Sequence, residues 1–491
     1  MGLAIDHVDF KPEDYELFTA RLETSLAALR QLLNTPGFGD GELSFGAELE
    51  LYLIDSEARP LHVNQDIHQQ LNDPLLTLEL NQYNLEYNFD PVLLSQNCFR
   101  ATQTQALSAL KKINACAQQW GGRVVPIGIL PTLGQADVGY HAMTILPRYE
   151  ALVKELGELR NGLFSIDIEG EDHLQLEMED VTLEGANTSF QVHLRVPVNE
   201  FADTYNALQL VTPLVLALAA NSPTLFGHRL WNETRIPLFK QSIDSRQHDP
   251  MHPKPARVNF GNGWLRKGAL ELFAEAVHLY RPILPIISDE EPLLELKEGR
   301  IPNLHELRLQ QGSIWLWNRP VYDSADGGHL RIEMRALPAG PTIVDMLANA
   351  ALLIGLTRAV RDSINQLLPA IPFQYCVRNF YRAAELGLAA EMIWPSLTQS
   401  EPQYQRVDNI LRSLLPQVPD KLEEMGFVRS DYSPLLKIIE ERLATGKTGA
   451  QWQLDRLAVL EQQLSKPEAL RQMVKEYVQH SDKNLPVAQW T

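Results

Sequence analysis

Three stretches of the chain alternate polar with apolar side chains and place carboxylates, an imidazole or guanidinium groups at every second position. They cover residues 45–55, 191–196 and 330–335. Because strand side chains point alternately to two faces, each stretch is predicted to gather its polar groups on one face. Carboxylates are ligands that Mg²⁺ prefers, and guanidinium forks fit phosphate oxygens. The stretches predict a polar cup for divalent cations and polyphosphate, built from Glu48, Glu50, His193, Arg331, Glu333 and Arg335.

A fourth alternating run, residues 78–89, adds Glu86 to this set. Each of these residues also has an ordinary explanation when it is taken alone. A strand glutamate is commonly solvated, a single histidine is commonly a hydrogen-bonded core residue, and an arginine commonly forms a surface ion pair. The joint occurrence of all these groups on alternating strands favours the functional interpretation.

Connections between strands are predicted from their flanking turns. The alternating run 173–179 is expected to form an antiparallel hairpin with 191–196, and residues 315–319 are expected to pair with 331–335. Residues 236–262 are rich in His, Pro and Gly, so we expect a long loop that is either a lid over a site or a plain surface loop.

Helical periodicity fills most of the remaining chain. It predicts helices over residues 12–34, 100–120, 204–220 and 342–361, and from residue 378 onward strand signals give way to helical ones. Strands and helices do not alternate strictly, which favours an α+β fold with a largely antiparallel sheet, flanking helices and a helical C-terminal part. We divide the chain into an N-terminal helical segment, 1–42, a catalytic core, 43–377, and a helical C-terminal region, 378–491.

The composition excludes several classes of protein. The 491 residues carry a formal net charge of -19, which argues against nucleic-acid or anionic-membrane partners. Three scattered cysteines indicate neither a disulfide framework nor a zinc site. The N-terminus lacks the basic and apolar parts of a secretion signal, and no apolar run is long enough to span a bilayer. We expect a cytoplasmic protein that acts on small molecules.

The motifs together resemble the glutamate–cysteine ligases of the glutamine synthetase-like superfamily. Residues 45–50, Phe-Gly-Ala-Glu-Leu-Glu, resemble the opening G-x-E-x-E strand of that family. Residues 219–223, Ala-Ala-Asn-Ser-Pro, followed by Gly227 and Thr234-Arg235, resemble its A-x-x-N-S-P block. Residues 331–335, Arg-Ile-Glu-Met-Arg, resemble its E-x-R strand. The resemblance extends over about residues 43 to 455.

The resemblance implies a glutamine synthetase-like active-site cup and ATP-dependent γ-glutamyl ligation, with cysteine as the expected amine acceptor. Glutamate would be phosphorylated by ATP, and the amine would then displace phosphate. Arg335 is expected to clamp the transferring phosphoryl group, Arg235 to bind phosphate or the glutamate carboxylate, and Arg331 and His193 to contact the nucleotide. The implied ligands of two or three Mg²⁺ or Mn²⁺ ions are Glu48, Glu50, Glu86, His193 and Glu333.

Three other functions remain open on the same residues. The chain is alternatively a ligase that joins glutamate or another carboxylate to a different amine, or an ATP-binding regulatory protein that has lost turnover. A metal-dependent hydrolase could also use the carboxylates and His193. None of these functions requires a protein nucleophile with a reactive thiol, so the cysteines are not expected to be catalytic.

Overall fold

A curled antiparallel sheet lies at the centre of the computed structural model, which describes residues 9–247, 254–396, 401 and 403–491. Its main path has the strand order β13-β14-β8-β1-β3-β2, and two further short strands pair with β1. The strands of the main path are, in that order, β13 (Asn318–Asp323), β14 (His329–Met334), β8 (Phe190–Arg195), β1 (Ser44–Ile54), β3 (Asn84–Asn88) and β2 (Leu76–Leu78). The further two are β4 (Val92–Leu93) and β5 (Arg123–Val125).

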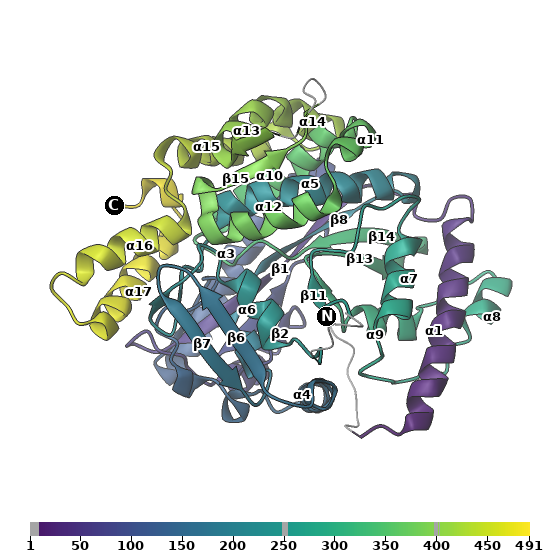
Figure 1. Ribbon diagram of the computed structural model, residues 1–491, viewed down its shortest axis with the longest axis horizontal. Coiled ribbons are helices and arrows are strands. Elements are labelled where there is room, and N and C mark those ends of the chain that lie inside the picture. The colour runs from purple at the N-terminus through teal and green to yellow at the C-terminus, as the bar shows by residue number, and fades with distance from the viewer. Residues whose placement is uncertain (1–8, 248–253, 397–400, 402) are drawn as a thin grey trace.

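The two faces of the sheet have opposite character, as the alternating sequences predict. On β1, Phe45, Ala47, Leu49 and Leu51 are almost completely buried in the largest apolar core. Three long helices supply the other side of that core: α3, Cys98–Ala117, α5, Phe201–Ala219, and α10, Ile343–Arg361. Figure 1 shows α5 and α10 lying across the sheet on this side. The glutamates of β1 therefore face the opposite, concave side.

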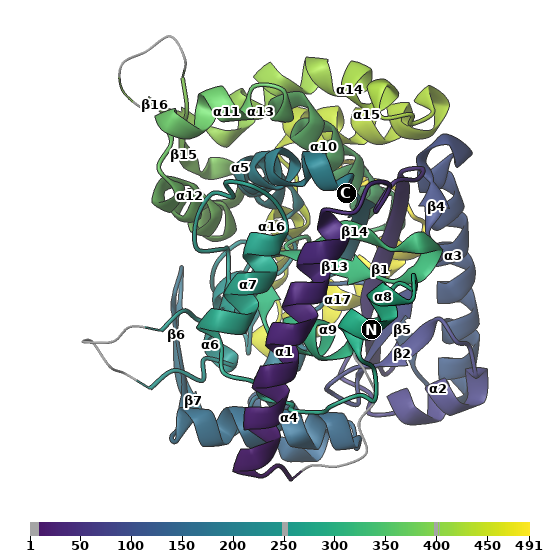
Figure 2. The same ribbon diagram turned by 90° about the vertical axis from the view of Figure 1, so that its right-hand side faces the viewer.

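A smaller group of helices stands over the concave side. Helix α1, Pro12–Leu33, packs against α7, Leu270–Leu279, and α9, His305–Gln311. Figure 2 shows α1 running along this group, in front of the sheet. Side chains from α7 and α9 face the polar strands across a cavity. The sheet and this helical group together enclose a space that Glu48 and Glu333 of the strands line.

The α+β fold with an antiparallel sheet and a helical C-terminal part is confirmed. The predicted helices and the hairpin of β13 with β14 are also present. The domain boundaries after residues 42 and 377 stay predictions. The apolar core continues past the second boundary, because α10 packs against α14, Val418–Glu424, and α15, Arg429–Thr445.

Three predicted features of the chain differ from the structure. Strand β7, His173–Met178, pairs with β6, Phe164–Glu169, and not with β8, because the short turn after β6 brings these two strands together first. The predicted loop 236–262 begins inside a helix, α6, Arg235–Ser242, and residues 248–253 lie outside the described part. The C-terminal region also contains a hairpin, β15, Glu391–Trp394, with β16, Gln403–Arg406.

One helix in the described ranges, α10, is long and apolar enough to cross a membrane by length and composition. However, 83% of its apolar window is buried inside the molecule, as is usual for a core helix. The apolar character of α10 is accounted for by its contacts with α5, α14 and α15.

Candidate active site

The register of the sheet brings polar groups from distant parts of the chain into neighbouring positions. Glu333 of β14 lies opposite His193 of β8 on one side and opposite Arg319 of β13 on the other. On the next strands, Glu50 of β1 lies opposite Glu86 of β3. The antiparallel pairing thus places all five predicted metal-ligand residues on one connected polar surface, because Glu48 shares the face of Glu50.

Glu333 lies at the positively charged end of this surface. Its carboxylate accepts hydrogen bonds from Nε and Nη2 of Arg319 at 2.8 to 3.1 Å, and it also accepts one from Arg335. Burial acts to raise the pKa of Glu333, but Arg319 and Arg335 hold that pKa well below its usual range. Arg335 Nη1 also donates to the side-chain oxygen of Gln191 at 2.5 Å. Both arginines are therefore held in place by fixed acceptors.

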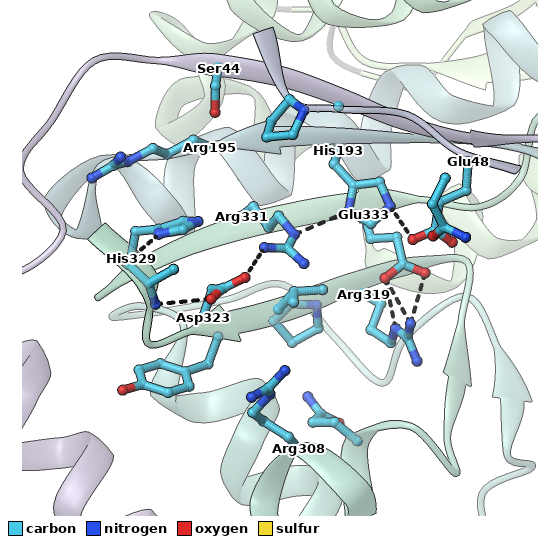
Figure 3. Close-up of a pocket in the computed structure, with 18 of the residues that line it drawn as sticks. Ser44, Glu48, His193, Arg195, Arg308, Arg319, Asp323, His329, Arg331 and Glu333 are labelled. Carbon is cyan, nitrogen blue, oxygen red and sulfur yellow. Dashed lines mark hydrogen bonds and ion pairs between the residues drawn. The ribbon is translucent and has the colours of Figure 1, made fainter. Parts of the chain in front are cut away.

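His193 lies between two carboxylates. Its Nε2 is 3.2 Å from Oε1 of Glu48, and ligand atoms of Glu48, His193 and Glu333 all lie within 4.8 Å of one another. Within the described residues, Nε2 is buried and has no partner in hydrogen-bond geometry. On the opposite edge of the ring, Nδ1 accepts a hydrogen bond from Nε of Arg331 at 3.1 Å. Figure 3 shows this group on the polar face of the sheet.

The other end of the polar surface has an excess of negative charge. Burial and the neighbouring Glu86 raise the pKa of Glu50 to about 7, against the opposing effect of Arg335. Burial and Glu48 also raise the pKa of Glu86. The carboxylate of Glu50 accepts hydrogen bonds from the backbone N–H of Ser189 and from the side chain of Gln191. These neutral donors orient Glu50 without cancelling its charge.

Two further glutamates, which the sequence analysis did not identify, belong to this acidic end. Burial, together with Glu86 and Glu50, raises the pKa of Glu79 well above its usual value. Burial and Glu50 raise the pKa of Glu184 to about 8. Glu79 lies inside the predicted alternating run 78–89 but is out of phase with Glu86, and in the structure it follows the last residue of β2. Glu184 lies in a short 3₁₀ turn, outside the alternating runs. Strand periodicity therefore placed neither of them with the site.

Arg319 was also missed, although the sequence contained a signal for it. The predicted pairing of residues 315–319 with 331–335 places Arg319 beside the second strand, and the observed register puts it opposite Glu333. The alternation of β13 was interrupted by Pro320, which obscured the pattern. Its Nε and Nη2 contact both carboxylate oxygens of Glu333, the paired geometry that favours a guanidinium–carboxylate bond.

Arg235, in contrast, is not on the sheet. It is the first residue of α6, and its side chain is only 2% exposed. Its Nε donates to Glu233 at 2.7 Å and its Nη2 donates to the carbonyl of Ala336, also at 2.7 Å. Arg235 therefore joins α6 to the segment that follows β14. Its electrostatic influence still reaches Glu50, whose pKa it lowers in opposition to burial.

A cavity of about 710 Å³ opens beside these groups, between the concave face of the sheet and the helices α7 and α9. Arginines surround it on several sides, and Figure 3 shows four of them around its walls. A phosphate-rich ligand fits such a lining, because guanidinium groups bind phosphate oxygens through paired N–H donors. The arginines of the lining are Arg148, Arg195, Arg308, Arg319 and Arg331.

The cysteines lie away from this surface. Cys98, Cys116 and Cys376 are buried and free. Burial raises the pKa of each thiol, which disfavours the reactive thiolate form. None of the three lines the cavity.

The donor set fits Mg²⁺ or Mn²⁺ better than softer metals. It consists of carboxylate oxygens with a single imidazole, and it contains no thiolate. The cluster of Glu48, His193 and Glu333 and the raised pKa values of the acidic end are features that bound cations would stabilise.

A family comparison identifies the class of protein. The model of glutamate-cysteine ligase family 2 matches residues 44–480, which include every polar strand described above. This chain belongs to that family. Membership makes it a ligase of the ATP-dependent carboxylate–amine type, as the resemblance of its motifs implied. No curated protein matches the chain.

Solved structures of similar shape include other ligases, all at low sequence identity. The glutamate–cysteine ligase of Francisella tularensis in complex with AMP is 10% identical, with a TM-score of 0.48; the match covers 91% of this chain and 90% of that one. A bifunctional glutathione synthetase from Pasteurella multocida is 12% identical, with a TM-score of 0.47, and the match covers 94% of this chain and 55% of that one.

Proposed function

We propose that this family member is an ATP-dependent γ-glutamyl ligase that joins glutamate to an amine, with cysteine as the expected acceptor. The observation that carries the proposal is the meeting of six carboxylates, one imidazole and two clamped arginines on the concave face of the sheet. A cavity lined by arginines opens directly beside them. Family membership supports the ligase class.

The proposed reaction has two steps and uses no protein nucleophile. An oxygen of the glutamate side-chain carboxylate bonds to the γ-phosphorus of ATP, the bond to the β–γ bridging oxygen breaks, and ADP leaves. The deprotonated amine then bonds to the acyl carbon, and inorganic phosphate leaves with the electron pair of the broken C–O bond. Two anions must approach each other in the first step, so the site must neutralise negative charge on the phosphate oxygens.

The residues of the site are suited to that neutralisation. Arg335 is held by Gln191 and Glu333, and we assign its guanidinium to the transferring phosphoryl group. Arg331 lines the cavity, where we assign it to the nucleotide together with His193. Arg235 is already committed to two acceptors, so we assign it to the glutamate carboxylate or phosphate only through its charge.

Divalent cations would be held by the carboxylates and the imidazole of the polar surface. When bound, Mg²⁺ or Mn²⁺ supplies positive charge to the phosphate oxygens and orients them. The protein keeps Glu50 fixed through Ser189 and Gln191, so that this ligand does not have to be ordered during binding. The proposed ligands are Glu48, Glu50, Glu86, His193 and Glu333.

A product assay tests the proposal directly. The purified chain is incubated with Mg²⁺-ATP, glutamate and each of a panel of amines, and ADP, phosphate and the amide product are measured by enzymatic assay and mass spectrometry. We expect stoichiometric ADP, phosphate and γ-glutamylcysteine with cysteine. Turnover with a different amine alone would reassign the acceptor. Nucleotide binding without turnover would favour the regulatory function, and hydrolysis without amide formation would favour a hydrolase.

A further inference from the structure

We infer that Arg331 controls whether His193 can bind a divalent cation, and that an anionic ligand in the cavity moves Arg331 away to permit it. Arg331 is thus a positioning residue. The identity of the anion, a nucleoside triphosphate, rests on the proposed function. The argument depends on which nitrogen of the His193 ring carries the proton.

The contact between Arg331 and His193 determines which ring nitrogen of His193 carries the proton. An arginine side chain only donates hydrogen bonds, since its guanidinium stays protonated in proteins. Nε of Arg331 lies 3.1 Å from Nδ1 of His193, so Nδ1 must be the acceptor and must carry the lone pair. A neutral imidazole with a lone pair on Nδ1 carries its proton on Nε2.

That proton is on the wrong nitrogen for cation binding. Nε2 is the ring atom that faces Glu48, at 3.2 Å, and it forms the ligand group with Glu48 and Glu333. A nitrogen that carries a proton in the ring plane has no lone pair to offer a cation. The hydrogen bond from Arg331 and cation binding through Nε2 therefore exclude each other.

The structure also indicates what moves Arg331. The guanidinium lines the cavity, and its Nη1 donates to Oδ2 of Asp323 at 2.6 Å, so it is attached to β13 on one side and to a neutral ring nitrogen on the other. A protonated guanidinium is attracted more strongly to an anionic oxygen than to a neutral ring nitrogen, because Coulomb attraction between opposite charges adds to the hydrogen bond. A phosphate oxygen in the cavity would therefore compete successfully with Nδ1 for Nε of Arg331.

Once Nδ1 is released, the proton can reside there and the lone pair can face Glu48 and Glu333. The cation then gains an imidazole ligand only when the anion is present. Metal and nucleotide should therefore show positive coupling through one named contact, of roughly fivefold or more in affinity. Without nucleotide, a cation at this surface would be held by carboxylates alone.

Mn²⁺ serves as the probe, because electron spin-echo spectroscopy detects nitrogen bound to this ion. The protein is labelled with ¹⁵N-histidine, so that a ¹⁵N modulation reports an imidazole ligand and not a nitrogen of the nucleotide. Spectra are recorded with Mn²⁺ alone and with Mn²⁺ plus β,γ-methylene-ATP, which resists hydrolysis. Wild-type protein should show the ¹⁵N signal only with the nucleotide analogue.

Variants separate the hydrogen bond from the charge of Arg331. Arg331→Met should show the ¹⁵N signal with Mn²⁺ alone and should bind Mn²⁺ more tightly without nucleotide. Arg456→Met removes an equal charge from the C-terminal helices, outside the cavity lining, and should leave the wild-type pattern unchanged. Adding His193→Gln to Arg331→Met should abolish the signal and the gain in affinity.

Two results would overturn the inference. The first is a ¹⁵N signal from wild-type protein with Mn²⁺ alone, which needs no variant to fold. The second is a folded Arg331→Met protein that binds Mn²⁺ without the signal. These experiments do not measure formation of the amide product. Absence of turnover in the product assay would therefore contradict the proposed function without changing either result.

Discussion

Glu50 and Glu333 share the polar face of the sheet but lie in opposite electrostatic surroundings. Glu333 is neutralised by Arg319 and Arg335, whereas Glu50 faces Glu86 and the other carboxylates of the acidic end. We predict that Glu50→Gln and Glu333→Gln each lower ATP turnover by about 10²-fold or more, since each removes a charge that the cations need. Initial rates at saturating Mg²⁺, with circular dichroism to check folding, measure the effect.

The control for these variants is Glu177→Gln on the exposed face of β7, which removes an equal charge far from the polar strands. It should turn over at the wild-type rate. A folded Glu50→Gln protein with unchanged turnover would remove Glu50 from the cation site, and the same holds for Glu333.

Arg335 provides a second prediction, on geometry and not on charge. A lysine at this position keeps the positive charge but loses the planar fork, of which Nη1 contacts both Gln191 and Glu333. Arg335→Lys should therefore lower kcat by roughly a hundredfold, with a smaller change in KM. Steady-state kinetics test this, with Arg456→Lys, which alters a pair with Glu476 on the C-terminal helices, as the matched control. A kcat within about threefold of wild type would exclude Arg335 from contact with the transferring group.

At this scale the sequence was informative wherever the site lies on regular strands. Strand side chains repeat every second residue, so a shared face could be predicted for the candidate residues, whose roles stay predictions: Glu48, Glu50, Glu86, His193, Arg331, Glu333 and Arg335. Glu79 and Glu184 could not be placed with them, because Glu79 is out of phase with Glu86 in the predicted run and Glu184 lies in a turn, which has no fixed period. The pairing of Arg331 with His193 was equally hidden, since it depends on the register between two strands 138 positions apart.

A buried ion pair joins helix α15 of the C-terminal region to the core, in addition to apolar packing. Arg442 of α15 donates to Asp345 of α10 at 2.7 Å and to Asn349 at 2.6 Å, and both members of the pair are at most 1% exposed. Arg442→Met removes the guanidinium that faces the buried carboxylate of Asp345 and leaves it the neutral donors Thr342 and Val487, so it should lower the free energy of unfolding by about 3–5 kcal/mol. Urea denaturation followed by circular dichroism measures the loss.

Arg412→Met on the neighbouring helix α13, Val407–Leu414, is the matched control, because that side chain donates only to a backbone carbonyl. It should cost less than Arg442→Met. Equal losses in the two variants would mean that the ion pair contributes nothing beyond the packing of an arginine stem.

Helices and strands with a strong local pattern could be predicted from the sequence. Strand pairings, and short strands that form only through pairing, could not. The long helices and β1 followed from periodicity alone. The pairing of β7 with β8 was wrong because two alternating strands compete for one partner, and loop length decides between them. The hairpin of β15 and β16 has four-residue strands, which are too short to establish a period.

The acidic end of the polar surface should make the stability of the whole molecule depend on pH. The folded-state pKa of Glu184 is about 8, above that of a glutamate in an unfolded chain, so the folded protein retains a proton that the unfolded chain has lost. Stability should therefore fall as pH rises from about 5 to 8 in the absence of divalent cations.

Glu184→Gln removes this penalty, so its Tm should exceed that of wild type at pH 8 and approach it at pH 5. Glu177→Gln serves again as the control and should follow the wild-type curve. Thermal melts in EDTA across this pH range measure the effect. A wild-type protein whose Tm is independent of pH between 5 and 8 would contradict the prediction.

The order of strands in the sheet has a consequence for biosynthesis. Strand β8 is paired with β1 on one side, but its other neighbour, β14, ends roughly 140 residues later in the chain. At translation rates of about 5–20 residues per second, β8 remains an open edge for roughly 7–28 s while the ribosome completes β13 and β14. During that interval its unpaired N–H and C=O groups are a template for pairing between nascent chains. We expect the yield of soluble protein to depend on chaperone supply and growth temperature.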